Sequence, residues 1–264
     1  MLFRSPDGNM IAFHSTRASM DGADAWIANL DGTGLRRITS LDAPELVIGS
    51  WSPDGRSITF DASVAGNGDI YLVSTEGEKP VRLTFAPALE GLPAWSRNGK
   101  WIYFTSTATG PIPEIWRVPA SGGPSERVTQ GGGFQPGFSP DGNSLYYLDR
   151  SPRGPGIPSV VAKLLRMPAA GGDPSVVLDR VPAFYWSISA RGVYFLTCDN
   201  HPPTQKLYLD LYRFTDEKIV RAGELPFRVA TEPGRFVVSP DGRRALASET
   251  TRNDTDLMLL ENFR

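Results

Sequence analysis

Short runs of alternating apolar and polar residues recur along the whole chain, separated by turns that contain Gly and Pro. Alternation with a period of two places every second side chain on one face, as in a half-buried β-strand. The runs are also rich in aromatic and β-branched residues, which favour strands over helices. Four of them are MIAFHS at 10–15, SITFDA at 57–62, WIYFTS at 101–106 and SLYYLD at 144–149. The pattern predicts an all-β protein.

A four-letter word precedes these runs at nearly regular intervals. SPDG occurs at 5–8, 52–55, 139–142 and 239–242, and the related words SRNG and SARG occur at 96–99 and 189–192. Pro presets φ in a turn, Asp tolerates the bridge conformation and Gly accepts positive φ. We therefore expect each word to form the hairpin between the first and second strands of a unit.

The spacing of the words predicts the architecture. The six anchor serines are 47, 44, 43, 50 and 50 residues apart, which suits a repeat of four short strands. Six such units around an axis make a six-bladed β-propeller with four antiparallel strands per blade. The blades are expected at 1–40, 41–84, 85–129, 130–178, 179–230 and 231–264. The last unit shows only three strands, so either its blade is three-stranded or sequence upstream of Met1 completes it.

Composition excludes several classes of protein. The 264 residues carry a formal net charge of −2, which argues against a dedicated nucleic-acid binder. One cysteine rules out an internal disulfide, and no apolar run is long enough to span a membrane. The N-terminus shows no signal peptide, so the sequence leaves a periplasmic or a cytoplasmic location open.

The third unit resembles a known family. The stretches PAWSRNGKWIYFTS, EIWRVPASGG and ERVT within 93–129 are similar to the WD-repeat-like units of TolB-type six-bladed propellers. The ending DTDLMLLENFR resembles the C-terminus of bacterial proteins that carry this propeller behind another module. In those proteins the module is often a winged-helix DNA-binding domain or a protein kinase domain. The resemblance implies a module of a larger bacterial protein and says more about fold than about function.

One face of such a propeller is the expected binding surface. The loops between second and third strands gather there with the loops that enter each first strand, and binding residues usually lie on variable loops. A ring of carboxylates at the channel mouth is also a candidate site for a hard cation such as Ca²⁺, against the alternative of ordinary solvated acids. No cofactor is expected, and a metal is left open. The candidate ligand- or partner-binding residues are Glu45, Glu90, Gln135, Tyr185, His201 and Glu232.

No catalytic constellation stands out. The acids at the start of the third strands, Asp24, Asp69, Glu114 and Asp256, recur in register, so we expect a structural contact made once per blade. Only two histidines are present, no G-x-S-x-G motif occurs, and Cys198 is expected to pack inside. We predict a non-catalytic module for protein interaction or ligand sensing. The alternatives are a metal-dependent hydrolase or lyase with its site at the channel mouth, and a propeller that gates substrate to a separate catalytic domain.

Overall fold

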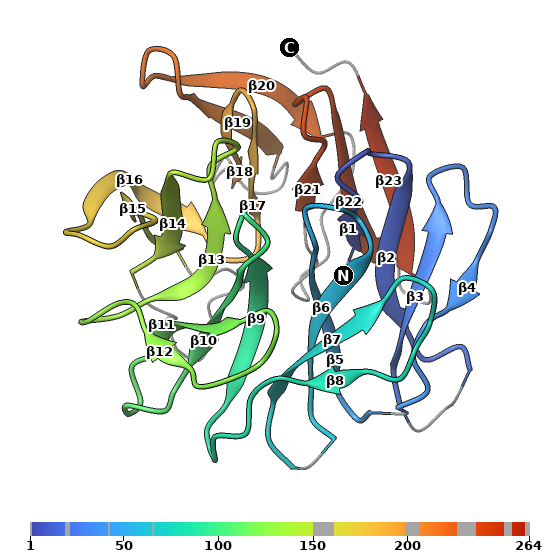
Figure 1. Ribbon diagram of the computed structural model, residues 1–264. Helices are drawn as coiled ribbons and strands as arrows, with labels where there is room; N and C mark the ends of the chain where they lie inside the picture. Colours follow the sequence, from blue (N-terminus) through green and yellow to red (C-terminus); the bar gives the residue numbers. More distant parts are fainter. Residues whose placement is uncertain are drawn as a thin grey trace.

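The computed structural model of the chain consists of β-strands arranged as sheets around a common centre (Figure 1). It describes residues 2–18, 22–41, 43–64, 66–149, 161–198, 206–225, 236–250 and 255–261. For 2–3, 247–250 and 255–261 it describes the backbone alone. All sheets within this part of the chain are antiparallel. Within each sheet, strands that follow one another in sequence are hydrogen-bonded neighbours.

Five sheets have four strands each. The first contains β1 Leu2–Arg4, β2 Met10–Ser15, β3 Asp24–Asn29 and β4 Arg36–Arg37, and the second contains β5 Leu46–Trp51, β6 Ser57–Ala62, β7 Asp69–Ser74 and β8 Val81–Arg82. The third contains β9 Glu90–Trp95, β10 Trp101–Ser106, β11 Glu114–Pro119 and β12 Glu126–Arg127. The fourth contains β13 Phe134–Phe138, β14 Ser144–Leu148, β15 Val161–Pro168 and β16 Ser175–Pro182, and the fifth contains β17 Trp186–Ser189, β18 Gly192–Cys198, β19 Leu207–Arg213 and β20 Ile219–Leu225.

The last unit of the repeat differs from the others. It forms a three-stranded sheet of β21 Phe236–Val238, β22 Arg244–Thr250 and β23 Thr255–Glu261. The structure therefore contains five complete blades rather than the six predicted. The missing element is the outer strand, because nothing in the described part of the chain pairs with the outer side of β23.

The first strands of the sheets surround the channel in chain order. Contacts join β1 to β5, β5 to β9, β9 to β13, and β17 to β21, and β21 contacts β1. Apolar clusters fill the space between neighbouring sheets. Ile27 and Phe60, from the first and second sheets, are each 0% exposed and lie in one such cluster. Burial of a side chain of this size contributes about 1.5–3 kcal/mol.

The SPDG words form the predicted hairpins between first and second strands. In the first unit, Gly8 has a φ of 76° and its N–H donates to the Ser5 carbonyl over 2.9 Å. The Ser5 hydroxyl donates to Asp7 Oδ1 and accepts the Met10 N–H over 2.9 Å. The hydroxyl hydrogen bond is the main reason that the pKa of Asp7 lies below its usual value. The serine hydroxyl thus joins the two ends of the turn by hydrogen bonds, a role that turn propensity alone does not reveal.

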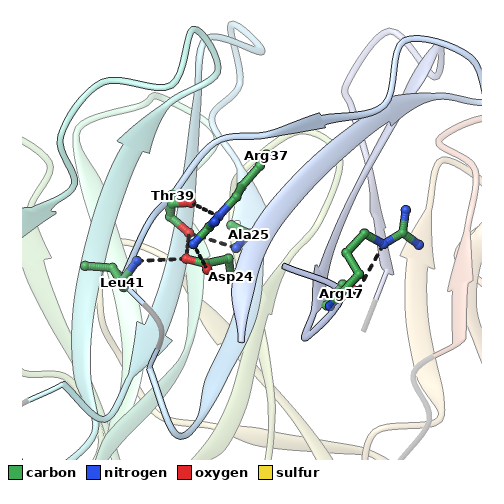
Figure 2. A network of polar contacts seen from close by, with 7 residues as sticks. Arg17, Asp24, Ala25, Arg37, Thr39 and Leu41 are labelled. Carbon is green, nitrogen blue, oxygen red and sulfur yellow. Dashed lines mark hydrogen bonds and ion pairs between the residues drawn. The ribbon is translucent and has the colours of Figure 1, made fainter. Parts of the chain in front are cut away.

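Three of the four acids that were expected to make a structural contact, Asp24, Asp69 and Glu114, each pair with an arginine of the outer strand. The side chain of the fourth, Asp256, lies outside the part of the chain that the structure describes. In the first sheet, Asp24 accepts hydrogen bonds from Arg37 Nη2, from the Thr39 hydroxyl and from the Leu41 N–H (Figure 2). The Thr39 hydroxyl also accepts the Ala25 N–H over 2.9 Å. Each of the three described acids is at most 3% exposed and forms an ion pair with the arginine of an Arg-x-Thr segment. In the first and third sheets the threonine hydroxyl also donates a hydrogen bond to the acid. The contact fastens the outer strand to the third strand.

Candidate functional site

The loop face is the side of the molecule formed by two kinds of connection: those from second to third strands, and those entering the first strand of the next sheet. Hydrogen bonds join the two kinds. Asn67 Nδ2 donates to the carbonyls of Ala86 and Ala88 over 3.0 and 3.2 Å, and the Gly133 N–H donates to the Pro113 carbonyl over 2.8 Å. The loop face is therefore a connected surface around the second and third sheets.

Four large apolar side chains are exposed on these connections, and we call them the apolar patch. Phe85 is 71% exposed, Leu89 60%, Ile112 58% and Val64 47%. The Arg82 guanidinium lies 4.7 Å from the centre of the Phe85 ring, which holds the ring against a cation. Large apolar side chains exposed on neighbouring connections of one face are typical of interaction surfaces. The sequence signal was apolar residues outside the alternating strands, in TFAPALEG and TGPIPE.

The predicted site residues do not form one open cluster. Glu45 is exposed on the loop that enters β5, whereas Glu90 is 3% exposed at the start of β9. Gln135 and Tyr185 are 8% and 9% exposed. His201 and Glu232 lie outside the residues that the structure describes.

Glu90 belongs to a buried polar cluster between the second and third sheets. Ser106 donates a hydrogen bond to Glu90 Oε1 over 3.3 Å, and Oε2 is buried without a hydrogen-bond partner. Burial raises the pKa of Glu90, hydrogen bonds from Thr84 and Ser106 oppose this effect, and the Asp69 carboxylate adds to it. This carboxylate is held where a large ligand does not reach it.

Glu90 is expected to make stability depend on pH. A carboxyl whose pKa is raised by folding favours the folded state below its unfolded pKa, near 4.5, and loses that contribution as pH rises through the folded pKa. Glu90→Gln should therefore be more stable than the wild type at pH 8, and the two should converge toward pH 4.5. The difference amounts to about 1.4 kcal/mol for each unit of pKa shift.

Urea unfolding at several pH values measures this difference. Glu45→Gln is the matched exposed control and should leave the stability curve unchanged. Parallel curves for Glu90→Gln and the wild type would show that burial of this carboxyl has no energetic consequence.

Gln135 and Tyr185 have structural partners. The Gln135 backbone has a φ of 56°, and its side-chain oxygen accepts the Phe184 N–H over 2.9 Å, which links the fourth sheet to the loop entering the fifth. Tyr185 packs in an apolar cluster with Leu196 and Phe236. Both residues thus hold neighbouring sheets together beside the channel.

A cavity of about 210 Å³ lies in the channel itself. Its walls come from the first strands of the second to sixth sheets, and six aromatic residues line it: Trp51, Trp95, Phe138, Phe184, Trp186 and Phe236. The polar lining includes Gln135 and Arg97. Arg97 stands in the third unit where the SPDG turns carry proline. The cavity is mainly apolar with a cationic edge, which suits a small ligand with an apolar body.

The remaining reactive residues are scattered. Among the described residues, no group of three or more His, Cys, Asp or Glu side chains is placed to hold a metal ion. Cys198, expected to pack inside, is exposed because it ends β18 beyond the buried part of that strand. No helix in the described part of the chain is long and apolar enough to cross a bilayer.

Comparison with known sequences identifies relatives of this chain. Residues 22–154 match the family described as the Tricorn protease N-terminal β-propeller domain. An uncharacterized protein of Agrobacterium fabrum is 32% identical over 146 residues, which cover 54% of this chain and 48% of that protein. The uncharacterized peptidase YuxL of Bacillus subtilis is 31% identical over 147 residues, or 54% of this chain and 20% of the peptidase. The matched region therefore spans about half or less of these relatives.

Solved structures give the same result for the fold. A TolB-type protein of Agrobacterium tumefaciens superposes with a TM-score of 0.60 at 27% identity, covering 67% of this chain and 63% of that one. TolB of Acinetobacter baumannii superposes over 98% of this chain and 60% of its own, with a TM-score of 0.72 at 19% identity. The architecture is a TolB-like β-propeller, and the chain belongs to the family of the Tricorn protease N-terminal β-propeller domain.

Proposed function

We propose that this chain is a non-catalytic, TolB-like propeller that serves as a protein-interaction module of a larger bacterial protein. Its ring counts six blades, with β21–β23 as the incomplete sixth. The loop face binds the partner, and the apolar patch is the centre of the contact.

The apolar patch is the observation that carries this proposal. Phe85, Leu89 and Ile112 are each more than half exposed, on neighbouring connections of one face. Burying such side chains in an interface would recover about 25 cal/mol for each Å² of apolar surface removed from water. Interfaces concentrate their binding energy in central aromatic and aliphatic anchors. Phe85, held by the Arg82 guanidinium, has the character of such an anchor.

The candidate residues at the channel mouth take different parts in this proposal. Glu45 is exposed and is available to a partner or ligand on the loop face, whereas Glu90, Gln135 and Tyr185 support the surface from below. His201 and Glu232 stay candidates for direct contact. Ligand sensing through the channel cavity is compatible with the same arrangement.

A second candidate function is the gating of substrate to a separate catalytic domain. The observation that favours it is the 31% identity to the peptidase YuxL, of which the matched region covers only 20%. The chain would then supply the propeller of a longer enzyme, and its channel cavity would filter what reaches the catalytic part. A metal-dependent hydrolase or lyase at the channel mouth is the remaining alternative.

A capture experiment with matched surface variants tests the proposed function. The wild type, Phe85→Ser/Leu89→Ser, and Val176→Ser/Ile219→Ser are immobilised and exposed to lysate of the encoding bacterium. Val176 and Ile219 are 51% and 55% exposed but lie on the outer strands β16 and β20, away from the loop face. We expect a protein that the wild type and the outer-strand variant retain equally, and that the patch variant retains at least about tenfold less.

Two results would contradict the proposal. One is capture that does not change when the patch is altered. The other is a stoichiometric bound metal together with hydrolytic or lyase activity in the pure protein, which would favour the enzyme instead.

A further inference from the structure

A groove of about 340 Å³ lies between the fourth and fifth sheets, on the face that carries the SPDG turns. One side of it is formed by the turn at 139–141 together with β14 and β15. The other side is formed by β19 and the hairpin that joins β19 to β20. This face is opposite to the loop face, because the turns lie at the other ends of the first strands. The groove also shares no lining residue with the channel cavity, so it is a separate candidate binding site.

The third sheet shows how the protein itself fills the corresponding positions. Tyr103, Arg117 and Glu126 lie opposite one another on three neighbouring strands. The Arg117 guanidinium donates two hydrogen bonds to Glu126 Oε2, over 2.9 and 2.7 Å, and one to the Tyr103 hydroxyl over 3.3 Å. The Tyr103 hydroxyl in turn donates to the Ala169 carbonyl of the fourth sheet over 3.5 Å. In this sheet a carboxylate of the outer strand therefore occupies the arginine.

The fourth sheet repeats the tyrosine and the arginine but lacks the acid. Tyr146, Arg166 and Ser175 take the three positions in that order. Among the described residues, the one carboxylate within 4 Å of the Arg166 guanidinium is Glu217 of the fifth sheet, whose Oε1 lies 3.9 Å from Nη1. A charge-assisted hydrogen bond is shorter, about 2.7–2.9 Å. Asp141 also lines the groove, but it is hydrogen-bonded within its own turn. The Arg166 guanidinium is therefore free to bind a second carboxylate.

Aromatic side chains supply the apolar part of the groove. The Phe214 ring stacks on Tyr146 with 5.8 Å between the ring centres, and it meets Tyr212 edge-on at 6.4 Å. Burial raises the pKa of both tyrosines, and the Arg166 guanidinium opposes this rise in both, so it lies near both rings. Both hydroxyls stay protonated and can donate hydrogen bonds. The groove thus places an aromatic surface beside two opposite charges, those of Arg166 and Glu217.

We propose that the groove binds a free α-amino acid with an apolar side chain. Arg166 binds the carboxylate, as Arg117 binds Glu126 in the third sheet, and the Tyr146 hydroxyl is a further donor. Glu217 binds the ammonium group, and the side chain of the ligand packs against Phe214. The two charges of the ligand then alternate with the two charges of the groove, so that every charge has an opposite charge beside it.

The same arrangement gives selectivity. A ligand with only a carboxylate places a negative charge beside Glu217, and a ligand with only an ammonium group places a positive charge beside Arg166. A peptide does not satisfy both, because its ammonium group and its carboxylate are on different residues. The proposal is independent of the function assigned to the loop face.

Calorimetric titration of the full chain with three matched probes tests the proposal. The probes are L-phenylalanine, hydrocinnamate, which is phenylalanine without its ammonium group, and phenethylamine, which is phenylalanine without its carboxylate. We expect L-phenylalanine to bind with a Kd of roughly 0.1–1 mM, as is usual for a ligand of this size. Hydrocinnamate and phenethylamine should each bind at least about tenfold more weakly, since each leaves one charge of the groove unmatched.

Variants of the groove assign the two charges. Arg166→Gln should weaken binding of L-phenylalanine at least about tenfold. Glu217→Gln should remove the preference for L-phenylalanine over hydrocinnamate, because only the ammonium group loses its partner. The register-matched control is Arg117→Gln in the third sheet, which should leave binding unchanged.

Ser175→Glu separates loss of binding from loss of folding. It places a carboxylate opposite Arg166, as Glu126 stands opposite Arg117 in the third sheet. We expect this variant to bind L-phenylalanine at least about tenfold more weakly, because its own carboxylate competes for the guanidinium. Its thermal melting temperature should be no lower than that of the wild type, since Ser175 is exposed and the change adds an ion pair.

Three outcomes would overturn the proposal. Absence of saturable binding of L-phenylalanine to the wild type would show that the groove is not an amino-acid site. Equal affinities for the three probes would reduce the interaction to contact with the aromatic surface. Unchanged affinity in Ser175→Glu would show that the carboxylate of the ligand does not bind at Arg166.

Discussion

Gly192→Ala is expected to destabilise the protein by about 3 kcal/mol or more. Gly192 begins β18 with a φ of 151°, and a Cβ atom at this position would lie 1.9 Å from the Tyr212 carbonyl oxygen and 2.9 Å from its carbonyl carbon. Both obstacles are backbone atoms of the paired strand β19, so no side chain can rotate away. The sheet would have to separate locally or lose the ladder pair between Gly192 and Arg213. Equilibrium unfolding in urea measures the loss.

Gly99→Ala is the control for this prediction. Gly99 ends the SRNG turn as Gly192 ends SARG, with a φ of 69°, but no heavy atom outside its chain neighbours lies within 4 Å of the place that an added methyl group would take. Only the cost of the left-handed backbone remains, about 1 kcal/mol. Similar losses at the two glycines would mean that β19 yields to the extra methyl group.

The two glycines also show which features of the repeat could be predicted from the sequence. The alternating runs and the turn words predicted the strands and the hairpins, because both depend on residues close together in the chain. The words SRNG and SARG look equivalent, yet the Gly192 position faces the Tyr212 carbonyl and the Gly99 position faces open space. That difference depends on the approach of another strand, which local sequence does not encode.

The candidate site could be predicted only in part. The loop face follows from the strand order, but exposure of individual side chains on it does not. Glu90 was expected at an open channel mouth, but the loop packing that brings its N–H to the Gly68 carbonyl also buries its carboxylate. The apolar patch was missed because isolated apolar residues in loops give no periodic signal. Phe85 and Leu89 are recognisable only once the strands are placed.

The contact between the acid of a third strand and its outer segment lies between these cases. Its members can be found in the repeat, since the arginine of Arg-x-Thr comes 13 residues after the opening acid in three units. What the sequence could not show is how each segment meets its acid. The threonine hydroxyl donates to the acid in the first and third sheets, whereas in the second sheet the segment pairs with Asp69 through Arg82.

The energetic importance of this contact can be measured at Asp24. Asp24→Ala is expected to cost about 3 kcal/mol, because it removes the acceptor of three hydrogen bonds at once. Asp24 is 1% exposed and Arg37 is 28% exposed, so the variant leaves a half-buried guanidinium without its carboxylate. The Leu41 N–H would lose its partner as well. Chemical denaturation of the wild type and the variant measures the change in the free energy of unfolding.

An ion pair on the surface is the control for Asp24→Ala. Arg213 and Asp216 are joined by two hydrogen bonds, but their side chains are 39% and 36% exposed, so Asp216→Ala should destabilise the protein much less than Asp24→Ala. Asp24→Asn should fall between these values, because it keeps an acceptor oxygen and loses the charge. Equal losses for Asp24→Ala and Asp216→Ala would show that burial adds nothing to the outer-strand contact. In that case Asp24, Asp69 and Glu114 would set strand register without stabilising their blades.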